Sequence, residues 1–194
     1  IESVAGALPP KWTPSSDALI HEYYTPPLLC LSLARVLRKH VEAMARTKGT
    51  VRALEPSAGI GRFVNALSFG SYKAVSWTAV EYSPISAAIL RAMRPDIRVV
   101  EGSFERFVAA EESSLMGNID LVVANPPYGE RGASFNDDPN RNYRERKAYV
   151  YFLRRSLDLL AAGGIGVFLV PYGFLTGRAA AHQELRSRVL KRHH

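Results

Sequence analysis

The chain of 194 residues is 47% apolar and 22% charged, and its 25 Lys and Arg residues exceed its 18 Asp and Glu residues, for a formal net charge of +7. This balance is typical of a single folded domain and excludes an intrinsically disordered chain. The single cysteine, Cys30, excludes an internal disulfide framework and favours a reducing compartment, the cytoplasm. No apolar run approaches the ~18 residues of a membrane-spanning helix, so no membrane association is expected.

The apolar pattern switches repeatedly between the period of a helix and that of a strand. The proline-rich residues 1–25 are predicted to form an extended arm. An amphipathic helix is predicted to follow it over 27–46. The predicted strands are 51–54, 76–80, 97–100, 119–124 and 165–170. The helices predicted between and after them are 59–69, 84–94, 104–116, 143–162 and 178–191. A polar loop is expected over 129–142, and Gly163-Gly164 is expected to end the helix before the last strand.

This alternation of strands and helices is typical of βαβ units with a parallel sheet. Right-handed crossovers then favour an α/β fold, a Rossmann-like doubly wound sheet of strand order 3-2-1-4-5, preceded by an N-terminal helical arm. Ligands of such sheets bind at the carboxyl ends of the strands, near the switch between the first and fourth strands. Candidate site residues are therefore sought where each predicted strand ends.

The first strand runs into a segment of small residues, Glu55-Pro56-Ser57-Ala58-Gly59-Ile60-Gly61, where the backbone can approach a ligand at a helix N-terminus. The second strand ends at Glu81, whose carboxylate can accept hydrogen bonds from both hydroxyls of a ribose. Together these features predict a cofactor that contains adenosine. A single Gly-x-Gly argues against a nicotinamide cofactor, and the lack of Gly-Lys-Ser/Thr argues against a nucleotide kinase.

The fourth strand ends in Asn125-Pro126-Pro127-Tyr128, a tetrapeptide that an ordinary Asn-Pro turn explains only in part. Two prolines fix the backbone and remove its donors, which leaves acceptors at the ligand edge of the sheet. The Asn125 side-chain carbonyl and the Pro126 backbone carbonyl can both accept from a planar amine, and Tyr128 offers a flat face for stacking. The pattern indicates a site that alkylates an amino group.

The positive charge is concentrated in two segments, 141–155 and 178–192, which favours a polyanionic partner over a merely soluble basic domain. The acidic pair Asp137-Asp138 in the polar loop is expected to be solvated rather than metal-binding. An aromatic group in the helix that follows can pack in the core or form a base-stacking surface, and core packing is favoured: Tyr149, Tyr151 and Phe152. The histidines and the cysteine lack the spacing of a zinc site, so no metal is expected.

With these motifs in place, the chain from about residue 22 to 190 resembles the S-adenosylmethionine-dependent adenine-specific DNA methyltransferases. It is most similar to the class in which the cofactor loop precedes the Asn-Pro-Pro-Tyr tetrapeptide and a target recognition domain follows. The resemblance implies that S-adenosylmethionine is the cofactor, that Glu55–Gly61 and Glu81 bind it, and that Asn125, Pro126, Pro127 and Tyr128 hold a flipped adenine. Methyl transfer to the exocyclic amine of adenine in DNA is the implied reaction.

Three further segments resemble motifs of that family. Tyr24-Thr25-Pro26 matches the motif beside the methionine moiety, and Leu169–Phe174 matches the signature of the fifth strand. Gly102-Ser103-Phe104 lies where the family often has an acid and then an aromatic residue against the adenine of the cofactor. Here Ser103 replaces the acid, while Phe104 keeps the aromatic ring that can stack on adenine.

The resemblance also divides the chain into an arm and helix at 1–46, packed on the cofactor site, and a catalytic domain at 47–194. It implies that the terminal strands and the target recognition domain belong to a longer polypeptide, such as the methylase portion of a restriction-modification or phage-defence protein, some of which carry a helicase. DNA is the expected partner. Methylation of RNA or of a protein glutamine amide, and a non-catalytic module that binds cofactor or DNA, remain alternatives.

Overall fold

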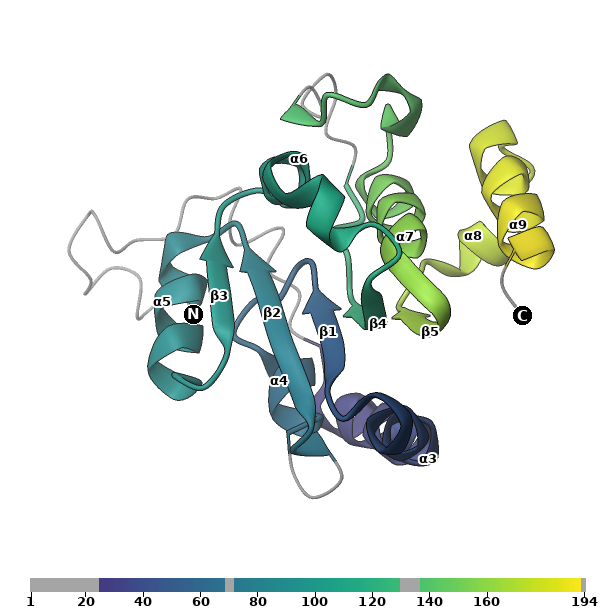
Figure 1. Cartoon of the computed structure of the whole chain (residues 1–194). Coiled ribbons are helices and arrows are strands. Elements are labelled where there is room, and N and C mark those ends of the chain that lie inside the picture. Colours follow the sequence, from purple (N-terminus) through teal and green to yellow (C-terminus); the bar gives the residue numbers. More distant parts are fainter. Residues whose placement is uncertain (1–24, 69–71, 130–136, 193–194) are drawn as a thin grey trace.

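The computed structural model describes residues 25–68, 72–129 and 137–192, and these residues contain one five-stranded sheet in which every strand pair is parallel. The strands are β1 (Val51–Glu55), β2 (Val75–Glu81), β3 (Arg98–Glu101), β4 (Ile119–Ala124) and β5 (Leu160–Phe168). They lie in the order β3-β2-β1-β4-β5 (Figure 1), which confirms the doubly wound sheet predicted from the sequence. The carboxyl ends of β1 and β4 therefore meet at the switch point of the sheet.

Helices precede, connect and follow these strands (Figure 1). They are α3 (Pro27–Lys48), α4 (Arg62–Ala66), α5 (Pro84–Met93), α6 (Phe104–Leu115), α7 (Ala148–Leu159), α8 (Tyr172–Thr176) and α9 (Ala180–Arg192), with a 3₁₀ turn, η4 (Arg141–Tyr143). Helices α3 and α5 begin on prolines, which are tolerated in a first turn. Ser83 also caps α5 by accepting a hydrogen bond from the Ser86 backbone N–H.

The sheet has an apolar core on each of its two faces, because neighbouring residues of a strand point to opposite sides. Ala53 of β1 packs in the cluster that also contains the buried residues of α3 and α4 and Leu90 of α5. The next residue, Leu54, packs in the cluster formed with α6 and α7. Both residues are almost completely buried, as expected for a parallel sheet covered on both faces.

The connection from α7 to β5 differs from the sequence prediction. The helix expected over 143–162 spans only Ala148–Leu159, and β5 already begins at Leu160. Gly163-Gly164, expected to end a helix, lies inside β5, where the pairing with β4 shifts register between Ile119 and Leu121. A Cβ at Gly164 would lie 2.9 Å from the Ala161 carbonyl oxygen of β5 and 3.0 Å from the Ile119 carbonyl oxygen of β4, so crowding by backbone at this irregularity, not a helix end, requires glycine there.

Two other elements also differ from expectation. Helix α4 is shorter than the predicted 59–69, because Gly61 adopts a left-handed conformation at the N-cap and the helical hydrogen bonding starts only after it. The short helix α8 was not predicted, since five residues are too few to show a helical period. The extended arm expected for residues 1–25 lies outside the described residues, except for Thr25.

Candidate active site

The loop between β1 and α4 makes a tight turn on two glycines. Gly59 and Gly61 have positive φ values of 54° and 78°. The Gly61 backbone N–H donates to the Ala58 carbonyl oxygen at 2.8 Å, and the Ala58 N–H donates to the Val80 carbonyl oxygen at 2.9 Å. A Cβ on Gly61 would lie 2.3 Å from Cδ1 of the buried Leu90. Glycine is therefore needed at position 61 both for its backbone angle and for close packing against α5.

We predict that Gly61→Ala lowers the free energy of unfolding by about 2–4 kcal/mol, from the left-handed backbone and the overlap with Leu90. Gly173→Ala is the matched control, because Gly173 lies in α8 and a Cβ there would have no neighbour within 4 Å. That control should leave the stability unchanged or raise it slightly. Denaturant unfolding of both variants measures the difference, and equal stabilities would contradict the role given to Gly61.

Glu81, at the end of β2, contacts this loop directly. Its Oε2 accepts from the Gly59 backbone N–H at 2.6 Å, and its Oε1 accepts from the Ser83 N–H at 2.7 Å. One carboxylate thus joins the loop after β1 to the turn before α5. Two parts of the sequence that were predicted to hold the same ligand are therefore in contact at the carboxyl edge of the sheet.

Glu55 is the last residue of β1 and is only 2% exposed. Its Oε2 accepts from the Val64 backbone N–H at 3.3 Å. Burial raises the pKa of Glu55 well above its ordinary value, and the charge of Glu81 raises it further, whereas the bond from Val64 opposes the shift. The folded protein therefore holds the Glu55 proton more tightly than the unfolded chain does.

This linkage predicts how stability depends on pH. Because the folded-state pKa is raised, the free energy of unfolding should fall as the pH rises above 4.5, the ordinary pKa of Glu55, through the raised folded-state pKa. Glu55→Gln should remove this loss and make the protein more stable than the parent at neutral pH. Glu184→Gln, which removes one negative charge at an exposed position of α9, is the control for the change in net charge. Thermal unfolding between pH 5 and 8 tests this prediction, and identical profiles for Glu55→Gln and the parent would reject it.

The tetrapeptide that follows β4 joins the same cluster. Asn125 Nδ2 donates to Thr25 Oγ1 at 3.1 Å, and the Asn125 backbone carbonyl accepts from Ser57 Oγ at 3.1 Å. The Tyr128 hydroxyl donates to Asn125 Oδ1 at 2.6 Å. Pro126 is buried and Pro127 is partly exposed. Asn125 thus links the loop after β1, the N-terminal segment and Tyr128, and its Oδ1 already serves as an acceptor.

Tyr128 keeps a partly open ring at this position. Its side chain is 41% exposed, and its ring meets the Tyr149 ring edge-on with centroids 6.3 Å apart. Burial of the hydroxyl end raises the pKa of Tyr128, so the hydroxyl remains a donor. An exposed aromatic face beside an amide acceptor can stack on a planar group and receive its N–H donors.

A cavity of about 30 Å³, enough for a few water molecules, lies where these segments meet. It is lined by Thr25, Glu55, Ser57, Ala58, Gly59, Arg62 and Asn125. Arg62 was not among the predicted site residues, yet its guanidinium donates to the Thr25 carbonyl oxygen at 3.2 Å. The only sequence signal for it was its place directly after Gly-x-Gly.

Two predicted cofactor residues after β3 are placed differently. Ser103 caps α6 by accepting from the Arg106 backbone N–H at 3.3 Å. Phe104 is 2% exposed and packs on Phe152, with ring centroids 5.1 Å apart. The Phe104 ring is therefore buried in the core of this structure, and its stacking on a cofactor adenine stays a prediction. Tyr24, the first residue of the N-terminal motif, lies outside the described residues.

The segment after the tetrapeptide also corrects an expectation. Asp137 is exposed and forms an ion pair with Arg106, but Asp138 is only 6% exposed and is not solvated. Among the aromatic residues of α7, the predicted core packing is confirmed, with exposures of 3%, 0% and 3% for Tyr149, Tyr151 and Phe152. In the described ranges, no three His, Cys, Asp or Glu side chains gather as a possible metal site. None of the described helices is both long and apolar enough to cross a bilayer.

The chain is similar to known methyltransferases. A model of the Eco57I restriction-modification methylase family matches residues 83–194, more than half of the chain. The solved structure of a type I restriction-modification system methyltransferase subunit from Streptococcus thermophilus is 20% identical, with a TM-score of 0.63 over 88% of this chain. The chain spans 39% of the length of that subunit. TYW2 from M. jannaschii, in complex with AdoMet, is 14% identical with a TM-score of 0.47, over 88% of this chain and 66% of that one. No curated protein matches the chain significantly.

Proposed function

The chain belongs to the Eco57I restriction-modification methylase family, and we propose that it transfers a methyl group from S-adenosylmethionine to the exocyclic amine of adenine in DNA. The observation that carries this proposal is the contact between the tetrapeptide and the loop after β1, through Asn125 and Ser57. It joins an amide acceptor and an exposed tyrosine ring to the predicted cofactor loop. Membership of a methylase family supports S-adenosylmethionine as the methyl donor.

The residues around the loop suit this cofactor. When bound, S-adenosylmethionine supplies an electrophilic methyl group on a positively charged sulfur. The Glu81 carboxylate contacts this loop and complements ribose hydroxyls, while the buried Glu55 side chain lines the cavity beside it. The backbone turn at Gly59 and Gly61 lets such a ligand approach closely. We place the cofactor on this loop for these reasons.

Asn125 and Tyr128 would hold the acceptor. In this structure the Tyr128 hydroxyl donates a hydrogen bond to Asn125 Oδ1, and the N–H of a bound amine would donate there in its place. An adenine flipped out of the duplex can stack on the exposed Tyr128 ring and donate its amine hydrogen to Asn125 Oδ1. Holding the nitrogen in one orientation lowers the entropic part of the barrier to transfer. The tetrapeptide thus acts by orientation and hydrogen bonding.

The test is a methyl-transfer assay with radiolabelled S-adenosylmethionine and the intact chain. Duplex DNA, RNA of the same sequence and a glutamine-containing peptide are offered as acceptors, and the product base is identified by mass spectrometry. We expect N6-methyladenine in DNA only. Label in RNA or in the peptide would replace the proposed substrate, and cofactor binding without any transfer would indicate a non-catalytic module.

We also propose that sequence reading resides in polypeptide beyond these residues. The chain spans 39% of the length of the similar methyltransferase subunit. Reading a DNA sequence requires side chains placed against base edges in a groove. A target recognition region, alone or with a restriction or helicase module, would supply them in the complete protein.

A further inference from the structure

The segment that follows the tetrapeptide returns to it. Residues 137–147 contain the 3₁₀ turn η4 and lead into α7. At the end of the segment the Ala148 backbone N–H donates to the Gly129 carbonyl oxygen at 3.1 Å, directly after Tyr128. The first turn of α7 also brings Tyr149 against the Tyr128 ring. The end of the 137–147 segment, where it enters α7, therefore lies near the proposed base-binding residue.

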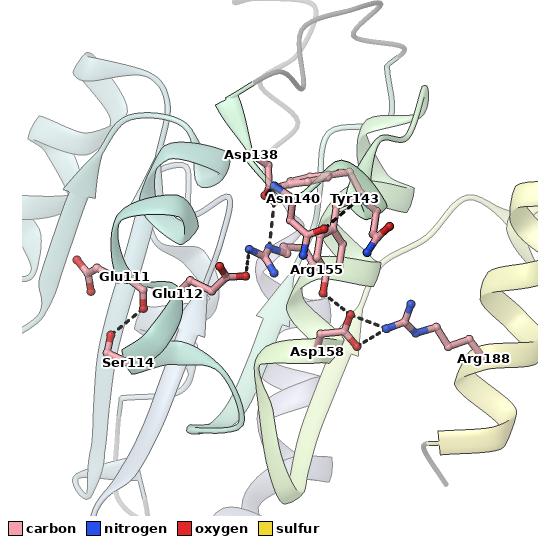
Figure 2. A network of polar contacts seen from close by, with 11 residues as sticks. Glu111, Glu112, Ser114, Asp138, Asn140, Tyr143, Arg155, Asp158 and Arg188 are labelled. Atoms are coloured by element: carbon pink, nitrogen blue, oxygen red, sulfur yellow. Dashed lines mark hydrogen bonds and ion pairs between the residues drawn. The ribbon is translucent and has the colours of Figure 1, made fainter.

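A buried arginine of α7 holds the start of this segment (Figure 2). Arg155 is 0% exposed, and its Nε lies 3.0 Å from Asp138 Oδ2. Its Nη2 donates to Glu112 of α6 at 2.7 Å. Asp138 also accepts from the Tyr151 hydroxyl at 2.8 Å and, through Oδ1, from the Asn140 backbone N–H at 2.9 Å. One buried cation thus joins α6, α7 and the 137–147 segment.

The same arginine supports the end of η4. Its guanidinium lies over the Tyr143 ring, 4.2 Å from the centroid. The Tyr143 hydroxyl donates to Asp158 at 2.6 Å, and Asp158 pairs with Arg188 of α9 at 2.6 Å (Figure 2). Both ends of η4 are therefore fixed by side chains from α7, and the network continues to α9.

This network is costly, because burying an ion pair loses hydration that its attraction repays only in part. Apolar side chains of similar volume would often stabilise a core equally well. In this structure the pair fixes the position of Asp138 at the start of the 137–147 segment. What the fixed segment exposes is positive charge: Arg141 at the start of η4 and Arg144 directly after it are both exposed.

The structure reduces the number of arginines in the two predicted basic segments that can contact a polyanion. Arg155 and Arg154 belonged to the segment expected to contact a polyanion, but Arg155 is buried and Arg154 pairs with Glu145 at 2.7 Å. In the second cluster, Arg186 donates to the Gly177 carbonyl oxygen at 2.8 Å and Arg188 pairs with Asp158. Many of these arginines therefore stabilise the fold itself, whereas Arg141 and Arg144 stay exposed.

We infer that the 137–147 segment is a surface that binds the phosphates of duplex DNA through Arg141 and Arg144, and that the buried Asp138–Arg155 pair positions it. The inference rests on the proposed function for the choice of DNA as the polyanion. Guanidinium groups suit phosphate because they donate in a planar fork. Beside Tyr128, such contacts would hold the strand whose base enters the site.

The first test is the salt dependence of DNA binding by the intact chain. Arg141→Ala with Arg144→Ala should make the negative slope of log K against log salt shallower by about 1.8, since each lost phosphate contact reduces its magnitude by about 0.9. Arg35→Ala with Lys39→Ala changes the net charge equally on the exposed side of α3, at the opposite end of the molecule (Figure 1). This control should keep the parent slope. Equal effects of the two pairs, or an unchanged slope for the first pair, would overturn the inference.

The second test asks whether Asp138 acts through these arginines. Asp138→Asn should weaken DNA binding in the parent chain but have no further effect when Arg141 and Arg144 are already alanine. Additive losses would overturn the positioning role. If Asp138→Asn does not fold, the apolar pair Asp138→Leu with Arg155→Met replaces it, and the same non-additive result is expected.

The two proposals can fail separately. Formation of N6-methyladenine in DNA tests the proposed function. The effect of the Arg141 and Arg144 changes on the slope of log K against log salt tests this inference. N6-methyladenine in DNA with an unchanged slope would reject the phosphate surface. A shallower slope without N6-methyladenine in DNA would support the surface and reject the substrate.

Discussion

Asn125→Ala is expected to reduce methyl transfer to adenine by roughly 10²–10³-fold, the usual cost of removing one oriented hydrogen-bonding group from an active site. The change deletes Oδ1, the acceptor that now receives the Tyr128 hydroxyl at 2.6 Å. Affinity for S-adenosylmethionine should change little, because the loop after β1 contacts Asn125 through its backbone carbonyl, which alanine keeps. Single-turnover transfer and calorimetry measure the two quantities separately.

Asn118→Ala is the matched control, because this exposed asparagine bonds to nearby backbone carbonyls in the turn before β4. It should leave transfer unaffected. Tyr128→Phe keeps the ring and removes the hydroxyl from Oδ1, so most of the turnover should remain. Tyr128→Ala removes the stacking face and should weaken capture of the base by roughly 1–3 kcal/mol. Near-normal turnover of Asn125→Ala would show that Oδ1 does not orient the amine.

The strand order could be predicted because the apolar pattern of parallel strands is strong. The central strands β1 and β4 are buried at nearly every position, so they appear as short apolar runs between helical segments. The boundary between α7 and β5 could not be predicted. The residues from Leu160 to Ala162 favour a helix by composition, and only their pairing with β4 makes them a strand.

The site residues likewise divide into those that the local sequence predicts and those whose position depends on tertiary contacts. Glu81, Gly59 and Asn125 were predicted because they follow strands, and parallel strands bring their carboxyl ends together. The orientation of Phe104 depends on the start of α6, which turns the ring toward Phe152 in the core. The burial of Arg155 depends on Asp138 and Glu112, which lie far from it in the sequence. Counting charges along a chain cannot identify such partners.

Glu81→Ala is expected to weaken S-adenosylmethionine binding by about 1.5–3 kcal/mol, the range for hydrogen bonds to a charged group, or roughly 10- to 150-fold in Kd. The variant would lose the hydrogen bonds of the carboxylate to a ribose, and also those to the Gly59 and Ser83 backbone N–H groups. The loop would therefore be less well ordered before binding. Titration calorimetry of the variant gives Kd, and thermal unfolding shows how much of the loss comes from the fold.

Glu101→Ala separates the role of Glu81 from that of any carboxylate at this edge. Glu101 pairs in register with Glu81 on the neighbouring strand β3, but it is about half exposed and pairs with Arg91 at 2.9 Å. A surface ion pair of this kind contributes little. Its removal should leave Kd unchanged, because Glu101 makes no contact with the loop after β1 among the described residues. Equal weakening by the two variants would mean that general negative charge, and not the position of Glu81 against Gly59, holds the cofactor.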